Sequence, residues 1–321
     1  MRISVIFTGG TIGSRTQNGP TDIDAAAKYT LLEPFKADGL CFEPVEPYSI
    51  LSENLSANEL NRLQGTVRDV LRTTPDGIIV THGTDTLHYT AAALALAFAD
   101  ADVPIVLVSA AYPLAHPQTN GFANFEGALT FIRHSGQTGV FVSYRNSGTD
   151  EVTVHHALRL LQHSEGGADL FSLGEPAARC KGDALLTACP VDGPTAALGT
   201  VTYTDAAPIL VIDSVPGGRY AYTLDGVRAV LLKPYHSATL NTDSEALRAF
   251  GRRAFEAGIP VYVSGVKSGP AYQSTARFDE LHIRKAPYST AIALYMKLWA
   301  AASLDRDIDA VVNSPVACEW L

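Results

Sequence analysis

The sequence is poor in the features that nucleic-acid and membrane partners require. Its 24 Lys and Arg residues are scattered and are outnumbered by 33 Asp and Glu, which gives a formal net charge of −9 at pH 7. Binding to a phosphate backbone depends on clustered basic residues, so we expect no nucleic-acid partner. No apolar run approaches the roughly 20 residues that a membrane-spanning helix needs, so we expect no membrane partner either.

Cysteine is also scarce, and its spacing matches neither a redox pair nor a metal site. The four cysteines form no CxxC pair: Cys41, Cys180, Cys189 and Cys318. Only residues 3–7 separate the first arginine from a glycine turn, which is far too short for the core of a signal peptide. We therefore expect a cytoplasmic protein whose cysteines are reduced thiols.

The sequence does contain a regular alternation of short and long apolar patterns. Val- and Ile-rich runs alternate with stretches of helical periodicity, which predicts βαβ units and a parallel sheet. The runs are continuously apolar, as burial on both faces of a sheet requires. The strands expected in the first part of the chain cover residues 3–7, 42–48, 77–80, 105–109 and 139–143.

Helix signals lie between these strands. Ser56 and Glu59 form a capping box, and an apolar stripe at helical spacing follows them. Two further helices are expected, one from Asp85 or Thr86 and one over residues 121–133. From about residue 183 to residue 208 the chain is rich in Pro, Gly, Thr and Ala with weak periodicity, which indicates a linker.

Beyond this stretch the α/β pattern resumes. Strands are expected at residues 209–213, 229–233 and 260–264, and helices at 243–257 and 289–303. The predicted fold class is α/β: a parallel-sheet N-terminal domain at residues 1–190, a linker at 191–208 and a smaller α/β C-terminal domain at 209–321.

Two strands run directly into turns of threonine and glycine. The first reads VIFTGGTIGS and contains Gly10 and Thr11; the second reads IIVTHGTDTLHYT and contains Gly83 and Thr84. In an open parallel sheet, ligands bind beyond the carboxyl ends of the strands, so both turns belong to the functional edge. Neither turn has the GK[ST] ending or the G-x-G-x-x-G spacing of a nucleotide-binding loop.

Asp85 follows the second turn at an expected helix N-terminus. Free backbone N–H groups there favour a bound carboxylate. Asp is also a preferred N-cap, so a purely structural role for Asp85 stays open.

The motif pair TGGTIG and THGTDT, about 70 residues apart, closely resembles the two signatures of the bacterial-type L-asparaginases, with most similarity to the cytoplasmic type. The resemblance implies a hydrolase that deamidates asparagine to aspartate and ammonia through an acyl-enzyme, with no metal and no cofactor. Position by position, Thr11 matches the nucleophile, Thr84 the second essential threonine, and Asp85 the carboxylate that holds the substrate's α-ammonium. Ser52 and Glu53, in the segment SEN, match contacts to the α-groups of the substrate.

The resemblance also implies a lid and a second subunit. Residues 14–28 form a long polar stretch that is expected to exclude water and to bring the activating Tyr29 to Thr11. Gly10 and Gly83 are expected to let the backbone approach the substrate. A homodimer or homotetramer is implied because the family completes its site with a neighbouring subunit; Asn241, Tyr272 and Glu280 lie in the corresponding region.

One departure concerns a lysine that the family uses with the second motif. This chain reads DEVTVHHAL there, so Val154 or His155 takes its place. Three interpretations stay open: His155 or His156 substitutes as a base, Lys181 reaches in, or the second triad is broken. Adjacent histidines without a carboxylate partner do not indicate a metal site. Asn120, where the family has Asp, is a second departure that bears on specificity.

The sequence therefore predicts an asparaginase-like amidohydrolase for a small amino-acid substrate. Two other functions remain open: an amino-acid sensor that has lost catalysis, and an amidase for a modified or larger asparagine-type substrate.

Overall fold

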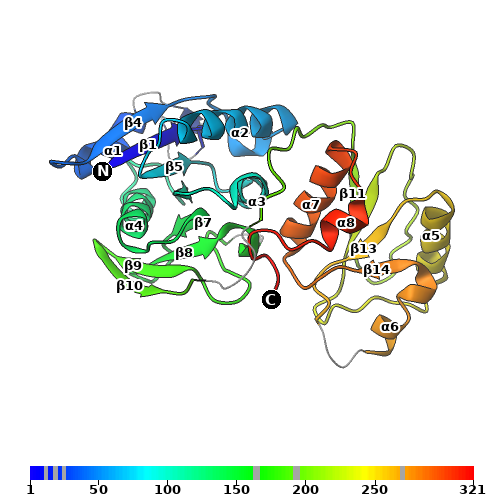
Figure 1. Ribbon diagram of the computed structural model, residues 1–321. Helices are drawn as coiled ribbons and strands as arrows, with labels where there is room; N and C mark the ends of the chain where they lie inside the picture. Colours follow the sequence, from blue (N-terminus) through cyan, green and yellow to red (C-terminus); the bar gives the residue numbers. More distant parts are fainter. Residues whose placement is uncertain (11–13, 17–20, 24–26, 162–166, 191–195, 268–271) are drawn as a thin grey trace. The chain divides into compact units, whose positions relative to one another are not determined.

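The computed structural model describes residues 1–10, 14–16, 21–23, 27–161, 167–190, 196–267 and 272–321 (Figure 1). The chain forms two compact units. The first comprises Met1–Thr200 with Val316–Cys318, and the second Val201–Pro315 with Glu319–Leu321. The division falls inside the stretch expected as a linker, and three residues near the C-terminus belong to the first unit.

The first unit is built on an eight-stranded sheet in the order β10-β9-β8-β7-β6-β5-β1-β4. Its strands are β1 (Arg2–Phe7), β4 (Cys41–Val45), β5 (Gly77–Thr81), β6 (Pro104–Val108), β7 (Gly139–Tyr144), β8 (Val152–His156), β9 (Ala178–Lys181) and β10 (Ala184–Ala188). The five neighbouring strands β4, β1, β5, β6 and β7 are parallel, as predicted. The strands β8, β9 and β10 continue the sheet in antiparallel pairing. The antiparallel part was not predicted, and β10 lies in the stretch expected to be irregular.

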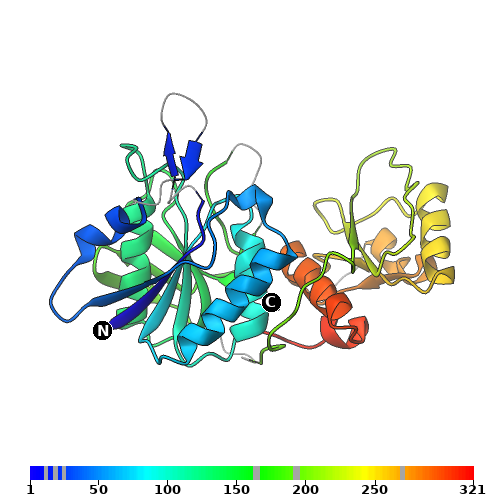
Figure 2. The same ribbon diagram turned by 90° about the horizontal axis from the view of Figure 1, so that it is seen from above.

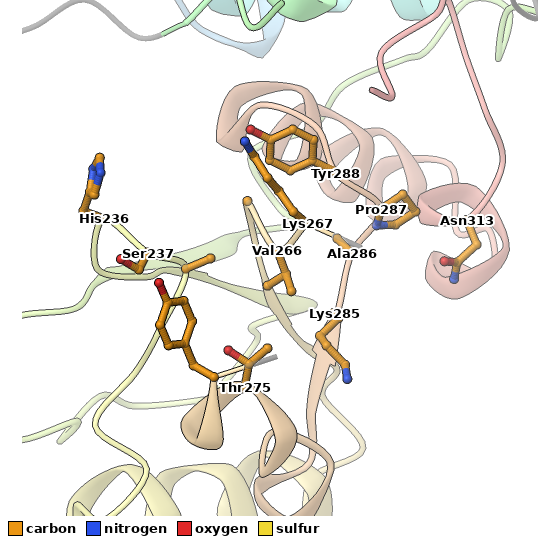
Figure 3. Close-up of a pocket in the computed structure, with 13 residues that line it drawn as sticks. His236, Ser237, Val266, Lys267, Thr275, Lys285, Ala286, Pro287, Tyr288 and Asn313 are labelled. Carbon is orange, nitrogen blue, oxygen red and sulfur yellow. The ribbon is translucent and has the colours of Figure 1, made fainter. Parts of the chain in front are cut away.

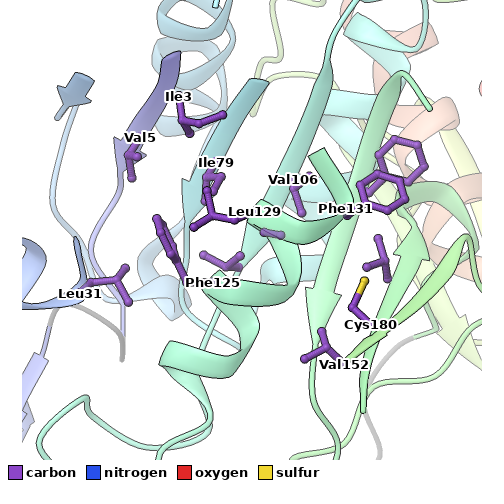
Figure 4. Close-up of a cluster of buried hydrophobic side chains, with 14 of the residues drawn as sticks. Ile3, Val5, Leu31, Ile79, Val106, Phe125, Leu129, Phe131, Val152 and Cys180 are labelled. Atoms are coloured by element: carbon purple, nitrogen blue, oxygen red, sulfur yellow. The ribbon is translucent and has the colours of Figure 1, made fainter. Parts of the chain in front are cut away.

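The central strands form because their β-branched residues are buried on both faces. β5, β6 and β7 are buried along their whole length. Register aligns the ends of these strands: Phe7 pairs with Thr81, and Thr81 with Val108. On one face, Phe125 and Leu129 pack against the sheet in a core that Figure 4 shows.

Three long helices cover this sheet, and Figure 2 shows them on its two faces. α2 (Ala57–Leu71) and α3 (Leu87–Phe98) lie on one face, and α4 (Gly121–His134) lies on the other. Ser56 caps α2 by accepting from the N–H of Asn58, and its hydroxyl also donates to the side chain of Glu59, so the two residues of the expected capping box are in contact at the start of the helix.

Part of the expected lid is ordered as regular structure. β2 (Ser14–Thr16) and β3 (Thr21–Ile23) form an antiparallel hairpin, and α1 (Ala27–Leu32) follows. A loop was expected here, and the described backbone instead contains paired strands. Short 3-10 helices are η2 (Glu33–Phe35), η3 (Ser52–Asn54), η4 (Ala157–Arg159) and η5 (Asp279–Leu281).

The second unit is a four-stranded parallel sheet in the order β11-β12-β13-β14. Its strands are β11 (Ile209–Asp213), β12 (Ala229–Lys233), β13 (Val261–Val263) and β14 (Ile283–Lys285), and its helices are α5 (Glu245–Glu256), α6 (Gln273–Ala276), α7 (Ala291–Ser303) and α8 (Ile308–Val312). Alternate residues of β12 face opposite layers: Val230 and Leu232 pack with α5, and Ala229 and Leu231 pack with α7. The prediction of a smaller α/β unit is confirmed.

Within the described parts of the chain, no helix combines the length and apolar character needed to cross a membrane.

Candidate active site

The turn after β1 is held by backbone bonds on one side and a threonine on the other. The N–H of Gly10 donates to the carbonyl of Ile50 at 2.9 Å, and the N–H of Ile50 donates to the carbonyl of Thr8 at 3.1 Å. The buried hydroxyl of Thr8 donates to the carbonyl of Thr81 at 2.7 Å. Thr8 therefore joins the end of β1 to the end of β5, and its hydroxyl serves the structure.

The two threonine turns touch at their glycines. A Cβ built on Gly10 would lie 2.3 Å from the nitrogen and 2.5 Å from the Cα of Gly83, which no side chain tolerates. Gly10 has a φ of +76°, a region that other residues rarely adopt. Thr11 follows Gly10 and lies outside the described residues, and the half-buried Thr84 follows Gly83. The structure thus brings into contact the two glycines that precede Thr11 and Thr84 in the sequence.

A second contact joins the THGTDT turn to the segment SEN. The hydroxyl of Ser52 donates to a carboxylate oxygen of Asp85 at 3.0 Å, and the hydroxyl of Thr86 donates to the carbonyl of Ser52 at 2.8 Å. A Cβ on Gly83 would lie 2.4 Å from the Ser52 hydroxyl. Thr86, and not Asp85, is the N-cap of α3, so the carboxylate of Asp85 faces Ser52.

The second turn also presents unpaired donors. The backbone N–H groups of Gly83, Thr84 and Asp85 donate no hydrogen bond to any residue that the structure describes. Such groups, just before a helix, suit a bound carboxylate or a developing oxyanion. The N–H of Gly10, by contrast, is already bonded to Ile50.

Sequence reasoning missed the role of His82, which lies within the second motif. The ring is buried, with Nδ1 2.8 Å from the carbonyl of Gly83 and Nε2 2.9 Å from the hydroxyl of Thr90. Since a carbonyl only accepts, Nδ1 carries the proton, and Nε2 accepts from Thr90. Burial lowers the pKa of His82, so a neutral imidazole fixes the carbonyl of Gly83.

Comparison with known proteins agrees with this arrangement. Residues 2–184, more than half of the chain, match the family described as "Asparaginase, N-terminal". The chain belongs to the asparaginase family.

Individual relatives of this family member are distant. The L-asparaginase of Thermococcus kodakarensis is 31% identical over 160 residues, which are 48% of this chain and 48% of that protein. One component of the glutamyl-tRNA(Gln) amidotransferase of Thermofilum pendens is 29% identical over 177 residues, 53% of this chain and 39% of that protein. The chain thus spans half or less of the length of these curated relatives.

The fold itself is shared over the whole length. The solved structure of the thermostable L-asparaginase from Thermococcus kodakarensis superposes with a TM-score of 0.83, covering 100% of this chain and 99% of that one at 23% sequence identity. This likeness establishes the α/β architecture of both units.

Two other predicted site residues of this asparaginase-family chain, Glu53 and Tyr29, are exposed. Glu53 is exposed on η3, next to Ser52. Tyr29 is 53% exposed on α1, beyond the hairpin of the expected lid. Because Thr11 lies outside the described residues, the predicted approach of Tyr29 to Thr11 stays a prediction.

The structure does not bring His155 and His156 to the second turn. Both lie on β8, where His155 pairs with Val142 and His156 with Phe141, below the carboxyl end of β7. β8 is three strands from β5, or roughly 14 Å at ordinary strand spacing. Both rings are buried, and Nδ1 of His155 bonds the hydroxyl of Ser172 at 2.7 Å. These contacts place them in the interior of the sheet.

The other candidates for the missing lysine are also placed away from a catalytic role. Val154 is fully buried in the apolar core with Val152 and Cys180. Lys181 is exposed on β9 and pairs with Asp150 at 3.5 Å. In the described parts of the chain, no group of three His, Cys, Asp or Glu residues could hold a metal ion.

The burial of His155 and His156 predicts that the folded protein loses stability in acid. Burial lowers the pKa of His155 from 6.5 to about 3 and that of His156 to about 4, with Arg179 and Arg159 adding to the respective shifts. A folded pKa below the unfolded one means that the unfolded chain binds the extra protons. Stability is therefore lost as the pH falls from about 6.5 toward these values, by up to ~1.4 kcal/mol per pH unit and histidine. Urea unfolding at pH 7.5, 6 and 5 measures the slope.

A variant isolates this effect. His155→Asn removes one of the two titrating groups and should reduce the pH dependence of the unfolding free energy, whereas the exposed His134→Asn on α4 should leave it unchanged. An equal slope in wild type and His155→Asn would contradict the assignment.

The C-terminal residues considered for a neighbouring subunit are dispersed in the second unit. Tyr272 is 61% exposed and lines a pocket of about 830 Å³ beyond the carboxyl ends of β12, β13 and β14, whereas Asn241 and Glu280 do not line it. Figure 3 shows Lys267 beside Tyr288 in this pocket, with the ammonium 5.1 Å from the ring centre. The pocket thus offers cations and aromatic rings at the functional edge of the second sheet.

Contact between the two glycines gives a stability prediction. Gly10→Ala should lower the free energy of unfolding by about 1–3 kcal/mol more than Gly39→Ala. Gly39 has a nearly equal φ of +79°, but a Cβ there would meet nothing within 4 Å. Urea unfolding of both variants separates the steric clash with Gly83 from the strain of the backbone conformation. Equal losses of unfolding free energy in the two variants would show that the turns do not touch.

Proposed function

We propose that this chain is an amidohydrolase that deamidates L-asparagine to L-aspartate and ammonia through a threonine acyl-enzyme. The observation that carries the proposal is the contact between Gly10 and Gly83, which places the backbones before Thr11 and Thr84 against each other. Membership of the asparaginase family supports the same chemistry.

The Ser52–Asp85 pair suits the α-groups of an amino acid. Here Ser52 donates to Asp85. An α-ammonium would replace the hydroxyl as the donor to Asp85, and the freed hydroxyl would then donate to the α-carboxylate. Glu53, next to Ser52, is proposed as a further polar contact to the ammonium.

The amide would then lie over the two turns. Thr11 attacks its carbonyl carbon, with Tyr29 as the proposed activating group, because a threonine hydroxyl is a weak nucleophile at its free pKa. Thr84 is proposed to place the water that hydrolyses the ester. The N–H groups of Gly83 and Thr84, which bond no described residue, are suitable donors to the developing oxyanion, and one such donor is typically worth ~3 kcal/mol.

The test is ammonia release by the purified protein from L-asparagine, L-glutamine and D-asparagine, followed in a coupled assay. We expect turnover of L-asparagine, and no release from any of the three would contradict the proposal. The reaction is proposed to take place in the cytoplasm, in a homodimer or homotetramer.

A second candidate is an amino-acid binding or sensor protein with impaired catalysis. It is favoured by the side chains that stand where the family has an ammonium: Val154 is in the apolar core, and burial keeps His155 neutral at neutral pH by lowering its pKa. Calorimetric binding of L-aspartate or L-asparagine without turnover would establish this alternative.

A further inference from the structure

A second pocket lies on the same sheet edge as the threonine turns. It has a volume of about 590 Å³ and is formed beyond the carboxyl ends of β6 and β7. Its lining includes Tyr112 after β6, Arg145 after β7, and Asp169. An ammonia leaving group does not fill such a volume, so the deamidation of free asparagine assigns this pocket no substrate part.

The order of the strands places this pocket on one particular side of the proposed site. Ser52 follows β4, the turns follow β1 and β5, and the pocket follows β6 and β7, in the sheet order β7-β6-β5-β1-β4. In this order the pocket lies beyond the turn of β5, on the side away from Ser52. A substrate bound by Ser52 and Asp85 would face the pocket with its leaving nitrogen when its side chain extends toward β6.

The frame of the pocket is fixed by Asn120. Its Oδ1 accepts from the N–H of Ala111 at 2.8 Å, and its Nδ2 donates to the carbonyl of Arg145 at 2.9 Å. The N–H of Arg145 donates in turn to Oδ1 of Asn124 at 2.7 Å. Asn120 thus ties the segment after β6 to the segment after β7, so the backbone that carries Arg145 is held on both sides.

Two polar groups of the pocket lack partners among the residues that the structure describes. The guanidinium of the half-buried Arg145 makes no hydrogen bond or ion pair with them. The hydroxyl of Tyr144, a residue only 1% exposed, makes no hydrogen bond with them either, and burial raises its pKa.

The carboxylates of the pocket, by contrast, are engaged. Asp169 accepts from the N–H and the hydroxyl of Ser147 at 2.7 and 2.8 Å, and Asp150 pairs with Lys181 at 3.5 Å. A half-buried cation that has no partner among the described residues favours an anionic ligand, and a guanidinium matches the fork of a carboxylate.

We propose that this pocket holds the leaving group of a secondary amide and that Arg145 binds a carboxylate on it. The substrate class is an aspartate whose side-chain carboxyl is amide-linked to the α-amino group of a second amino acid. The inference rests on the proposed function, because the threonine chemistry is the same. It assigns to the pocket a substrate part that free asparagine lacks.

The reaction balances as hydrolysis. Thr11 forms an ester with the β-carbonyl carbon, the C–N bond breaks, and the amine leaves with the proton of the threonine hydroxyl. Water then cleaves the ester, so that one amide and one water give aspartate and a free amino acid.

The reach is consistent with this substrate. The carboxylate carbon of the leaving amino acid lies about 4 Å from the reacting carbon by ordinary bond lengths. Neighbouring strands are ~4.8 Å apart, so from a reacting carbon over the end of β5 this carboxylate would extend most of one strand spacing toward β6, and the side chain of Arg145 would span the remaining gap from β7.

The experiment compares kcat/KM for β-aspartyl-leucine with kcat/KM for L-asparagine in wild type and in Arg145→Gln. We expect wild type to cleave both, and Arg145→Gln to lower the dipeptide-to-asparagine ratio roughly 10- to 100-fold through a higher KM for the dipeptide, as loss of a charge-assisted hydrogen bond implies. Arg145→Lys should recover part of the ratio. Arg72→Gln, at the exposed C-cap of α2, is the matched control and should leave the ratio unchanged.

The neutral probe is β-aspartyl-leucine amide, in which the carboxylate is replaced by a carboxamide. Arg145→Gln should change its turnover far less than that of the dipeptide. If wild type cleaves asparagine but not the dipeptide, or if Arg145→Gln leaves the ratio unchanged, the pocket assignment is overturned and the proposed function stands. If neither compound is cleaved, the proposed function fails and the pocket assignment fails with it.

Discussion

Thr84→Ala should lower kcat for L-asparagine by roughly 10²–10⁴-fold, the usual contribution of a group that assists proton transfer. The reason is its position: Thr84 follows the glycine that touches Gly10, and its hydroxyl makes no hydrogen bond with any described residue. A hydroxyl that is not bonded to the described fold is available to water or substrate. Thr11→Ala should cause a comparable or larger loss, since the nucleophile itself is removed. Steady-state ammonia release measures both.

The stability of Thr84→Ala distinguishes a chemical effect from a structural one. Because the hydroxyl is not bonded to the described fold, its removal should change the free energy of unfolding by less than ~1 kcal/mol. Thr66→Ala is the matched control, since Thr66 is a half-buried threonine of α2 whose hydroxyl donates to the carbonyl of Arg62. Full activity in Thr84→Ala, or an equal loss in Thr66→Ala, would refute the role of Thr84.

The parallel strands could be predicted because the residues of each strand, taken alone, indicate that it is buried. β5 and β6 are short, β-branched and apolar throughout, and turn residues bound them. The antiparallel extension lacks such a local signal. β9 alternates between buried and exposed residues over only four positions, and β10 is an exposed edge strand of mixed composition. Both are stabilised by pairing with strands already in place, which a local pattern does not encode.

Local sequence signals and contacts between distant residues also differ in how far they predict the site. The threonine turns were predicted because glycine next to threonine at a strand end is a local signal. The hydroxyl of Thr86 reaches Ser52, 34 positions earlier, and His82 fixes the turn through Thr90 on α3. These are tertiary contacts of residues that are common at helix starts for other reasons. His155 was a candidate base because of its residue type and its place in the chain, where the family has a lysine, and its burial in β8 is a property of the sheet.

The second unit contains a buried ion pair that predicts a large stability effect. The ammonium of Lys297 on α7 donates to the carbonyls of Val312 and Ser314 at 3.2 and 2.6 Å and to Glu319 at 2.5 Å. The side chains of Lys297 and Glu319 are 3% and 0% exposed. Burial lowers the pKa of Lys297, and the charge of Glu319 opposes that shift. Lys297 therefore links the chain after α8 and the C-terminal residues to α7.

Lys297→Met should lower the free energy of unfolding by about 3–5 kcal/mol, because it leaves the carboxylate of Glu319 buried without its partner. The double variant Lys297→Met/Glu319→Leu removes both charges and should recover much of that loss, a non-additivity that a double-mutant cycle from urea unfolding measures. The exposed pair Arg72–Asp69, with both side chains 72% exposed, supplies the control, and Arg72→Met should cost less than ~1 kcal/mol. If Lys297→Met lowers the free energy of unfolding no more than Arg72→Met does, the Lys297–Glu319 pair is hydrated. Removing one partner of an ion pair is costly only when the charge left behind is shielded from water.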